Sequence, residues 1–169
     1  MKTKNLVMAA VLLAVGTILH MIPGIVNGVK PDFLLATLFF ALIINRDLKA
    51  TIAIGVVAAA LAALTTSFPG GQIPSVIDKI ITSMIVFGLI KTFNVTEGST
   101  KAVAILTGIG TIISGAIFLG SAMALVGLPG GAGFFPMMVA IVLPTAALNT
   151  IFGAILCKVY AGFLKYSYA

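Results

Sequence analysis

Apolar residues fill the chain in long runs, which are interrupted only by short segments rich in polar residues, glycine and proline. A hydrocarbon core about 30 Å thick needs roughly 20 apolar residues in a helix that rises about 1.5 Å per residue. The pattern predicts six membrane-spanning helices, over residues 5–22, 31–45, 48–68, 73–91, 100–127 and 135–164. The second run is short for a span, and the last two are long enough to tilt or kink. Pro144 is expected to kink the last one, because proline removes a backbone donor.

The composition points to the same class of protein. Hydrophobic residues make up 60% of the 169 residues and charged residues only 8%, and the mean hydropathy is +1.23. A soluble domain has about 25% charged residues, so a soluble globule is excluded. We therefore expect an all-α integral membrane protein, with residues 1–169 forming one domain in contact with membrane lipid. The N-terminal run is interpreted as a first span rather than a cleaved signal peptide, because apolar runs follow it throughout.

The basic residues predict the orientation in the membrane. The net charge is +6, but the basic residues are scattered singly, which argues against a nucleic-acid partner. Lys30 alone lies on one side of the predicted spans, and Lys79 lies within one. Eight of the ten basic residues lie on the other side, namely Lys2, Lys4, Arg46, Lys49, Lys91, Lys101, Lys158 and Lys165. The positive-inside rule then predicts a multi-pass protein of the cell membrane with both termini in the cytoplasm.

The three loops on the outer side share a Pro-Gly sequence, at Pro23-Gly24, Pro69-Gly70-Gly71 and Pro129-Gly130-Gly131. Proline presets a turn dihedral angle and glycine permits a positive φ, so we expect compact, ordered turns. These turns either serve only for tight re-entry, or fold over a site where the Gly-Gly pairs let the backbone approach a ligand.

The fourth run has a polar face. Residues at helical spacing along it are Ser75, Asp78, Lys79, Thr82 and Ser83. The apolar residues Val76, Ile77, Ile80, Ile81, Met84 and Ile85 fill the other face. Pro74 favours a helix that begins close by, which places the two charges roughly 6–8 Å below the outer end. A charge at membrane depth is expensive unless it is paired or faces a polar cavity.

Two interpretations of Asp78 and Lys79 follow. They form either a structural ion pair between helices or a binding site for a zwitterion. In the second case Lys79 binds a carboxylate and Asp78 an ammonium group. Adjacent residues do not face each other squarely on a helix, so we expect the two side chains to diverge toward two ligand groups.

Other runs carry weaker candidates. Ala10 and Ala14 in the first run form a small-xxx-small element, which lets another helix approach closely. Asn149 is expensive near mid-membrane unless it is hydrogen-bonded, either to a ligand or to a neighbouring helix. His20 lines an outer cavity or is a solvated residue at the membrane edge. Phe68 and Phe134 form an aromatic floor or lid for a flat ligand, or anchor the chain at the interface.

Several kinds of chemistry find no support in the sequence. The chain lacks a Gly-x-x-x-x-Gly-Lys-Ser/Thr loop, and its only histidine, His20, has no second ligand at metal-binding spacing. Cys157 is the single cysteine. We therefore expect no enzyme activity, no cofactor and no metal.

These residues resemble a known family. Six short spans, cytoplasmic termini and Ala10-xxx-Ala14 resemble the S component of an energy-coupling factor (ECF) transporter. Within that group, three segments resemble the tryptophan-transporter members: Lys30-Pro31-Asp32, Thr65-Thr66-Ser67-Phe68-Pro69-Gly70-Gly71-Gln72-Ile73-Pro74 and Asp78-Lys79.

The resemblance implies a membrane subunit that binds L-tryptophan for uptake. It docks through Ala10 and Ala14 onto an ECF transmembrane coupling subunit, which carries two ATPase subunits. Residues 65–79 belong to the site region. The site hypothesis assigns the carboxylate to Lys79 and the ammonium to Asp78, hydrogen bonds to Gln72, Thr66 and Asn149, and stacking on the indole to Phe68 and Phe134.

Three alternatives remain open at this point. The same fold could bind another aromatic or vitamin-like substrate. An autonomous proton-coupled carrier would use Asp78 as its titrating group, but a single ionisable pair without a relay is sparse for proton coupling. The last alternative is a purely structural or assembly protein of the membrane.

Overall fold

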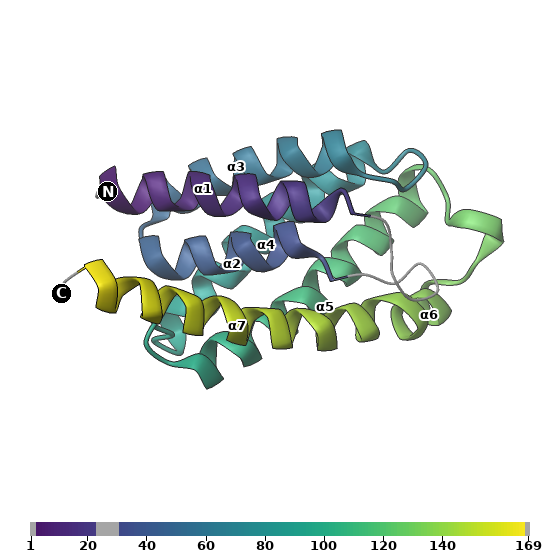
Figure 1. The fold of residues 1–169 in the computed structure, drawn as a ribbon. Helices are drawn as coiled ribbons and strands as arrows, with labels where there is room; N and C mark the ends of the chain where they lie inside the picture. Colours follow the sequence, from purple (N-terminus) through teal and green to yellow (C-terminus); the bar gives the residue numbers. More distant parts are fainter. Residues whose placement is uncertain (1–2, 23–30, 168–169) are drawn as a thin grey trace.

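The computed structural model describes residues 3–22 and 31–167, and every regular element within them is helical (Figure 1). The main helices are α1 (Thr3–His20), α2 (Phe33–Asn45), α3 (Leu48–Thr65), α4 (Gln72–Thr92), α5 (Thr100–Leu125) and α7 (Leu143–Ser167). Short elements precede α7: a 3-10 turn η1 (Pro129–Gly131), α6 (Phe134–Met137) and a π-helical turn η2 (Met138–Val142). The prediction of an all-α membrane bundle is confirmed, and the run predicted as the last span, 135–164, is divided among α6, η2 and α7.

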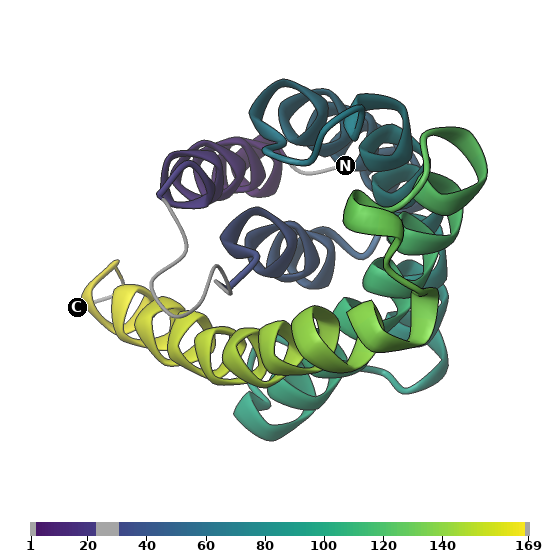
Figure 2. The same cartoon turned by 90° about the vertical axis from the view of Figure 1, so that its right-hand side faces the viewer.

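Helix α2 lies in the centre of the bundle, and the other long helices surround it (Figure 2). All of its residues from Leu34 to Ile44 are buried. With 13 residues it is about 20 Å long, which is shorter than a hydrocarbon core of about 30 Å. The five other runs form helices long and apolar enough to span a membrane. Helix α2 is therefore a core helix, which explains why the second run is short and apolar on every side.

Aspartates begin two of these helices. The Asp32 side chain accepts a hydrogen bond from the Leu35 backbone N–H (3.0 Å) at the start of α2. Asp47 does the same for the Ala50 N–H (3.2 Å) at the start of α3. Such side-chain caps satisfy backbone donors that have no partner inside the helix. The cap also fixes the Asp32 carboxylate at one end of the central helix.

Small residues let neighbouring helices approach closely. A Cβ atom on Gly16 of α1 would lie 2.0 Å from the Thr37 Oγ1 of α2. A Cβ atom on Gly55 of α3 would lie 2.9 Å from the Ser83 Oγ of α4. Close packing of this kind holds membrane helices together, because lipid is as apolar as their surfaces.

The helical run from Phe134 onward is irregular just before Pro144. The chain makes a π-helical turn at Met138–Val142. Pro144 has no N–H to donate to the carbonyl of Ala140, four residues earlier and within that turn. The irregularity expected from Pro144 thus lies in the turn that precedes it.

The Pro-Gly turns after α3 and after α5 lie at the end of the bundle opposite the start of α1 and the end of α7 (Figure 1). At the turn between α3 and α4, Gly70 has a φ of 71° and the Gly71 N–H donates to the Phe68 carbonyl (2.9 Å). Gly130 and Gly131 in η1 have φ values of 63° and 70°. These two turns are compact, as predicted; Pro23-Gly24 lies outside the described residues.

Candidate functional site

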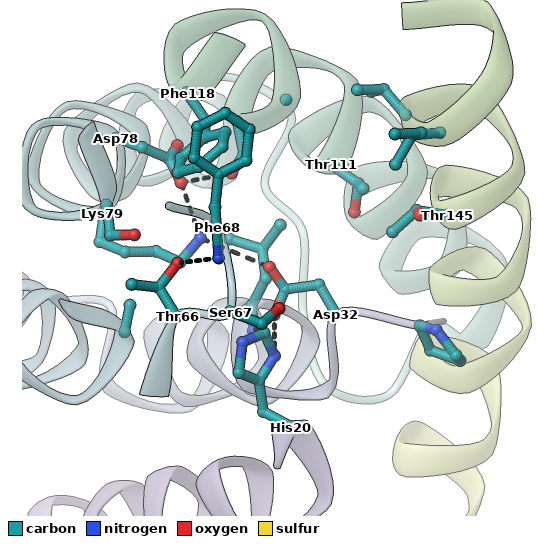
Figure 3. Close-up of a pocket in the computed structure, with 18 residues that line it drawn as sticks. His20, Asp32, Thr66, Ser67, Phe68, Asp78, Lys79, Thr111, Phe118 and Thr145 are labelled. Atoms are coloured by element: carbon teal, nitrogen blue, oxygen red, sulfur yellow. Dashed lines mark hydrogen bonds and ion pairs between the residues drawn. The ribbon is translucent and has the colours of Figure 1, made fainter. Parts of the chain in front are cut away.

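A cavity of about 240 Å³ lies at the end of the bundle where α3 turns into α4 (Figure 3). Segments far apart in the sequence converge on it, from the end of α1 to the start of α7. Its lining residues are His20, Pro31, Asp32, Leu35, Ala62, Thr66, Ser67, Phe68, Ser75, Asp78, Lys79, Thr111, Ser114, Gly115, Phe118, Ile141, Val142 and Thr145.

Helix α4 turns its polar face toward the interior. All five residues predicted to share that face are buried, whereas Ile80, Ile81, Met84 and Ile85 are each about 40% exposed. The predicted face is therefore confirmed. Of its members, Ser75, Asp78 and Lys79 reach the cavity.

The charged side chains of α4 converge instead of diverging. Lys79 Nζ lies 2.6 Å from Asp78 Oδ2 and 3.4 Å from Asp32 Oδ2. The expectation that Asp78 and Lys79 point toward separate ligand groups is therefore wrong. Both residues lie on the buried face, and the flexible lysine stem lets the ammonium group reach back to its neighbour.

Asp78 is enclosed by donors. Its side chain is 1% exposed. Oδ1 accepts a hydrogen bond from Thr82 Oγ1 (2.8 Å), and Oδ2 accepts one from Ser114 Oγ of α5 (2.8 Å) in addition to that from Lys79. A buried charge is tolerated when it is both paired and hydrogen-bonded, and Asp78 meets both conditions.

Asp32 is the more open of the two carboxylates, with a side chain that is 21% exposed. Besides the cap on Leu35, its Oδ1 lies 3.2 Å from His20 Nδ1, and its Oδ2 has the long contact to Lys79. The cluster therefore contains two carboxylates, one ammonium group and the His20 imidazole. The site hypothesis did not include Asp32, although Asp32 belongs to the Lys30-Pro31-Asp32 segment that carries the family resemblance and caps the start of a buried helix.

Aromatic rings form another wall of the cavity. The rings of Phe68 and Phe118 meet edge to face, with centroids 5.2 Å apart and planes at 90°. Thr66 Oγ1 accepts a hydrogen bond from the Phe68 backbone N–H (3.2 Å), which fixes the start of the turn. Thr111 and Thr145 line the cavity away from this wall (Figure 3).

Five of the predicted binding residues line the cavity together, namely His20, Thr66, Phe68, Asp78 and Lys79. Ser114 and Phe118 also line the cavity, and neither was among the predicted binding residues. Phe118 lies one helical turn beyond Ser114, so a search for residues four positions apart would have found it.

Three other predicted residues lie elsewhere. Gln72 is exposed in the first turn of α4 and does not line the cavity. Phe134 packs edge to face on Phe135, with centroids 5.5 Å apart. Asn149 is fully buried one layer behind the cavity, where its Nδ2 donates to Thr111 Oγ1 (3.0 Å).

The alanines proposed for docking lie on the outer surface of the bundle. Ala10 and Ala14 are both exposed, on the side of α1 that also exposes Val7, Val11 and Ile18. No described helix of the chain covers this face.

Comparison with known proteins identifies the family. The family model described as tryptophan transporter TrpP matches residues 2–165. The chain belongs to the TrpP tryptophan transporter family. The resemblance seen in the sequence is therefore confirmed at the level of that family.

Three bacterial proteins are similar over nearly the whole chain, and each is named a probable tryptophan transport protein. The protein of Clostridium acetobutylicum is 45% identical, and the match covers 92% of this chain and 91% of that protein. The protein of Bacillus subtilis is also 45% identical, and the match covers 89% of this chain and 87% of that protein. The protein of Clostridium perfringens is 40% identical, and the match covers 93% of this chain and 91% of that protein. No solved structure matches the chain. These names describe transport proteins, in agreement with the expectation that the chain is not an enzyme.

Proposed function

We propose that this chain binds L-tryptophan in the cavity and serves as the substrate-binding membrane subunit for its uptake. ATP hydrolysis on partner subunits of an ECF-type transporter would drive the transport. One observation carries the proposal: a cavity within an apolar bundle brings a lysine, carboxylates and two aromatic rings together. The names of the similar proteins from Clostridium acetobutylicum and Bacillus subtilis support tryptophan as the substrate.

The lining is complementary to an aromatic amino acid. Lys79 offers a cation for the carboxylate of the ligand, and the carboxylates beside Lys79 can accept hydrogen bonds from the ligand's ammonium group. The indole ring would pack against Phe68 and Phe118, since aromatic rings favour edge-to-face and offset contacts. The hydroxyl groups of Thr111 and Thr145 lie within the same cavity and suit the indole N–H.

The distribution of charge supports uptake as the direction of transport. The cavity lies at the end of the bundle opposite the start of α1 and the end of α7. The described basic residues outside the cavity lie toward the other end, at Lys4, Arg46, Lys49, Lys91, Lys101, Lys158 and Lys165. By the positive-inside rule that end faces the cytoplasm, so the cavity would receive substrate from outside.

The exposed face of α1 supports a coupling partner. Ala10 and Ala14 leave a shallow strip between larger apolar residues, which suits close approach of a helix from a transmembrane coupling subunit. In this proposal the coupling subunit carries the two ATPase subunits.

The binding test uses a property of the sequence. The chain contains no tryptophan, so the indole fluorescence in a binding experiment comes from the ligand alone. The fluorescence anisotropy of L-tryptophan should rise saturably when the purified protein is added, because the bound ligand tumbles with a large particle. An anisotropy that stays at the value of free tryptophan would contradict the proposal. Stronger displacement by a different aromatic or vitamin-like compound would favour that substrate.

The coupling test separates binding from uptake. Ala10→Leu combined with Ala14→Leu should abolish tryptophan uptake by cells that supply the coupling and ATPase subunits, while binding by the purified variant is retained. Ala147→Leu is the matched control, since Ala147 is exposed on α7, which does not contact α1. Accumulation of tryptophan by proteoliposomes that contain this chain alone would instead establish an autonomous carrier.

A further inference from the structure

The two carboxylates beside Lys79 differ in how many partners they already have. An ionised carboxylate offers about four lone-pair positions. Asp78 uses three of them, for Thr82, Ser114 and Lys79, all at 2.6–2.8 Å. A carboxylate that is 1% exposed and bonded in this way has little capacity left for a ligand.

Asp32 is bonded on one oxygen and open on the other. Its Oδ1 faces the Leu35 N–H and His20, whereas within residues 3–22 and 31–167 its Oδ2 has only the contact to Lys79 at 3.4 Å. That distance is long for a charge-assisted hydrogen bond, which is normally about 2.7–2.9 Å. The Oδ2 atom can therefore accept a shorter and stronger bond from an incoming donor.

We propose that Asp32, and not Asp78, receives the ammonium group of an α-amino acid in this cavity, while Lys79 receives its carboxylate. The assignment rests on the proposed function, in which the cavity binds tryptophan. Asp78 is then a positioning residue, which holds the Lys79 ammonium in place through the bond of 2.6 Å.

The arrangement of charges fits a zwitterion. Asp32 Oδ2 and Lys79 Nζ are opposite charges 3.4 Å apart. An α-amino acid carries opposite charges on two groups bonded to the same carbon atom, so it can lie alongside this pair with each of its charges facing the opposite one. Lys79 has three N–H donors, of which Asp78 occupies one at short distance. A ligand without its ammonium group would place a carboxylate beside Asp32 with no cation of its own to face that residue.

Ligands that lack one charged group test the assignment. L-Tryptophan, indole-3-propionate and tryptamine all contain an indole, so their binding can be followed by the same anisotropy measurement. Indole-3-propionate lacks the ammonium group and tryptamine lacks the carboxylate. Asp32→Asn removes the charge but keeps an oxygen that caps α2, since asparagine is a good N-cap residue. Asp78→Asn is the matched variant at the other carboxylate.

The expected result is a change in preference rather than a general loss. A hydrogen bond to a charged group contributes enough for Asp32→Asn to weaken L-tryptophan binding by about 10- to 100-fold. The same substitution should weaken tryptamine and leave indole-3-propionate unchanged or bound more tightly. Asp78→Asn should weaken L-tryptophan and indole-3-propionate by the same factor, because it loosens Lys79, and should keep their ratio.

Three results would overturn the assignment. Asp32 does not bind the ammonium group if the Asp32→Asn variant still prefers L-tryptophan over indole-3-propionate. The same conclusion follows if that preference is lost in Asp78→Asn instead. If Asp32→Asn does not fold, Asp32→Ser supplies another capping oxygen without the charge, and the same ratio decides. A wild-type chain that binds no L-tryptophan would overturn the proposed function, and this assignment with it.

Discussion

Replacing Lys79 by methionine tests how far the charge cluster depends on its cation. Methionine has a flexible side chain of similar length but no charge, so the substitution leaves the space filled. It removes the ammonium group that lies between Asp32 and Asp78. Asp78 would then keep only two hydroxyl donors, from Thr82 and Ser114, in a position where its side chain is 1% exposed.

The magnitude follows from the burial of the pair. Removing one partner of a buried ion pair costs about 3–5 kcal/mol, because the remaining charge is left uncompensated. The two hydroxyl donors on Asp78 place the expected loss near the lower limit, at about 3 kcal/mol of unfolding free energy. Combining Lys79→Met with Asp78→Asn removes both charges. The double variant should recover about 2 kcal/mol of that loss, a typical interaction energy for groups in contact.

The single cysteine provides the stability assay. Cys157 is 1% exposed, and its Sγ donates to the Glu97 carbonyl (3.0 Å). A fluorogenic thiol-reactive dye should therefore label the protein only when it unfolds. Thermal unfolding of the wild type, both single variants and the double variant gives the complete cycle. L-Tryptophan at a hundredfold excess over its Kd should stabilise the wild type by about 2.7 kcal/mol, and should not stabilise either variant that lacks Lys79.

Two outcomes would refute this reasoning. If Lys79→Met unfolds at the same temperature as the wild type, Lys79 does not compensate a buried charge. If the double variant is as stable as the wild type and is also stabilised by L-tryptophan, the pair is a structural ion pair and Lys79 does not bind the carboxylate. The second outcome would leave the fold intact and move the ligand to another part of the cavity.

The remaining predictions concern other parts of the structure. Gly16→Ala should destabilise the protein by about 1–3 kcal/mol in the same thermal assay, because the added Cβ atom clashes between α1 and α2. Gly88→Ala is the control: a Cβ atom there has nothing within 4 Å, so the substitution should be neutral or stabilise the protein by about 0.5–1 kcal/mol. Asp47→Ala should cost about 1 kcal/mol of stability by removing the cap of α3, without changing the affinity for L-tryptophan measured by anisotropy. Phe118→Leu should weaken L-tryptophan binding by roughly 2- to 10-fold through loss of an aromatic contact, while Phe135→Leu, at a residue that is 78% exposed and outside the cavity, should not. Equal affinities of the two phenylalanine variants would contradict an aromatic wall for the ligand.

The sequence predicted well those features that depend on positions along one helix. The polar face of α4 follows from helical spacing alone, and the structure buries all of its members. The central position of α2 was not predicted, but its short apolar run is consistent with it. A helix with no polar side must be covered on every side, either by lipid or by protein, and only its length separates the two cases.

Features that depend on contacts between helices could not be predicted in this way. Asp32 and Lys79 are separated by 47 positions, and their contact exists only because α2 lies at the centre beside α4. Gln72 was assigned to the site because it lies within residues 65–79, and Phe134 because it is an aromatic residue near the start of the last run. Proximity along the chain does not determine the direction of a side chain at a helix start, and neither residue lines the cavity.

The cluster also connects the site to the surface proposed for docking. His20 at the end of α1 contacts Asp32, which in turn contacts Lys79 of α4. The remaining contacts between α1 and α2 include the close approach at Gly16, and the opposite side of α1 exposes Ala10 and Ala14. A ligand that bonds to Asp32 Oδ2 shares this carboxylate with His20, which contacts Oδ1, so the ligand binds the same side chain that holds the end of α1. If docking on α1 changes the binding free energy of tryptophan, then tryptophan must change the free energy of docking by the same amount, because the two equilibria are linked. A cavity and a docking face that share one helix therefore need no separate element to couple them.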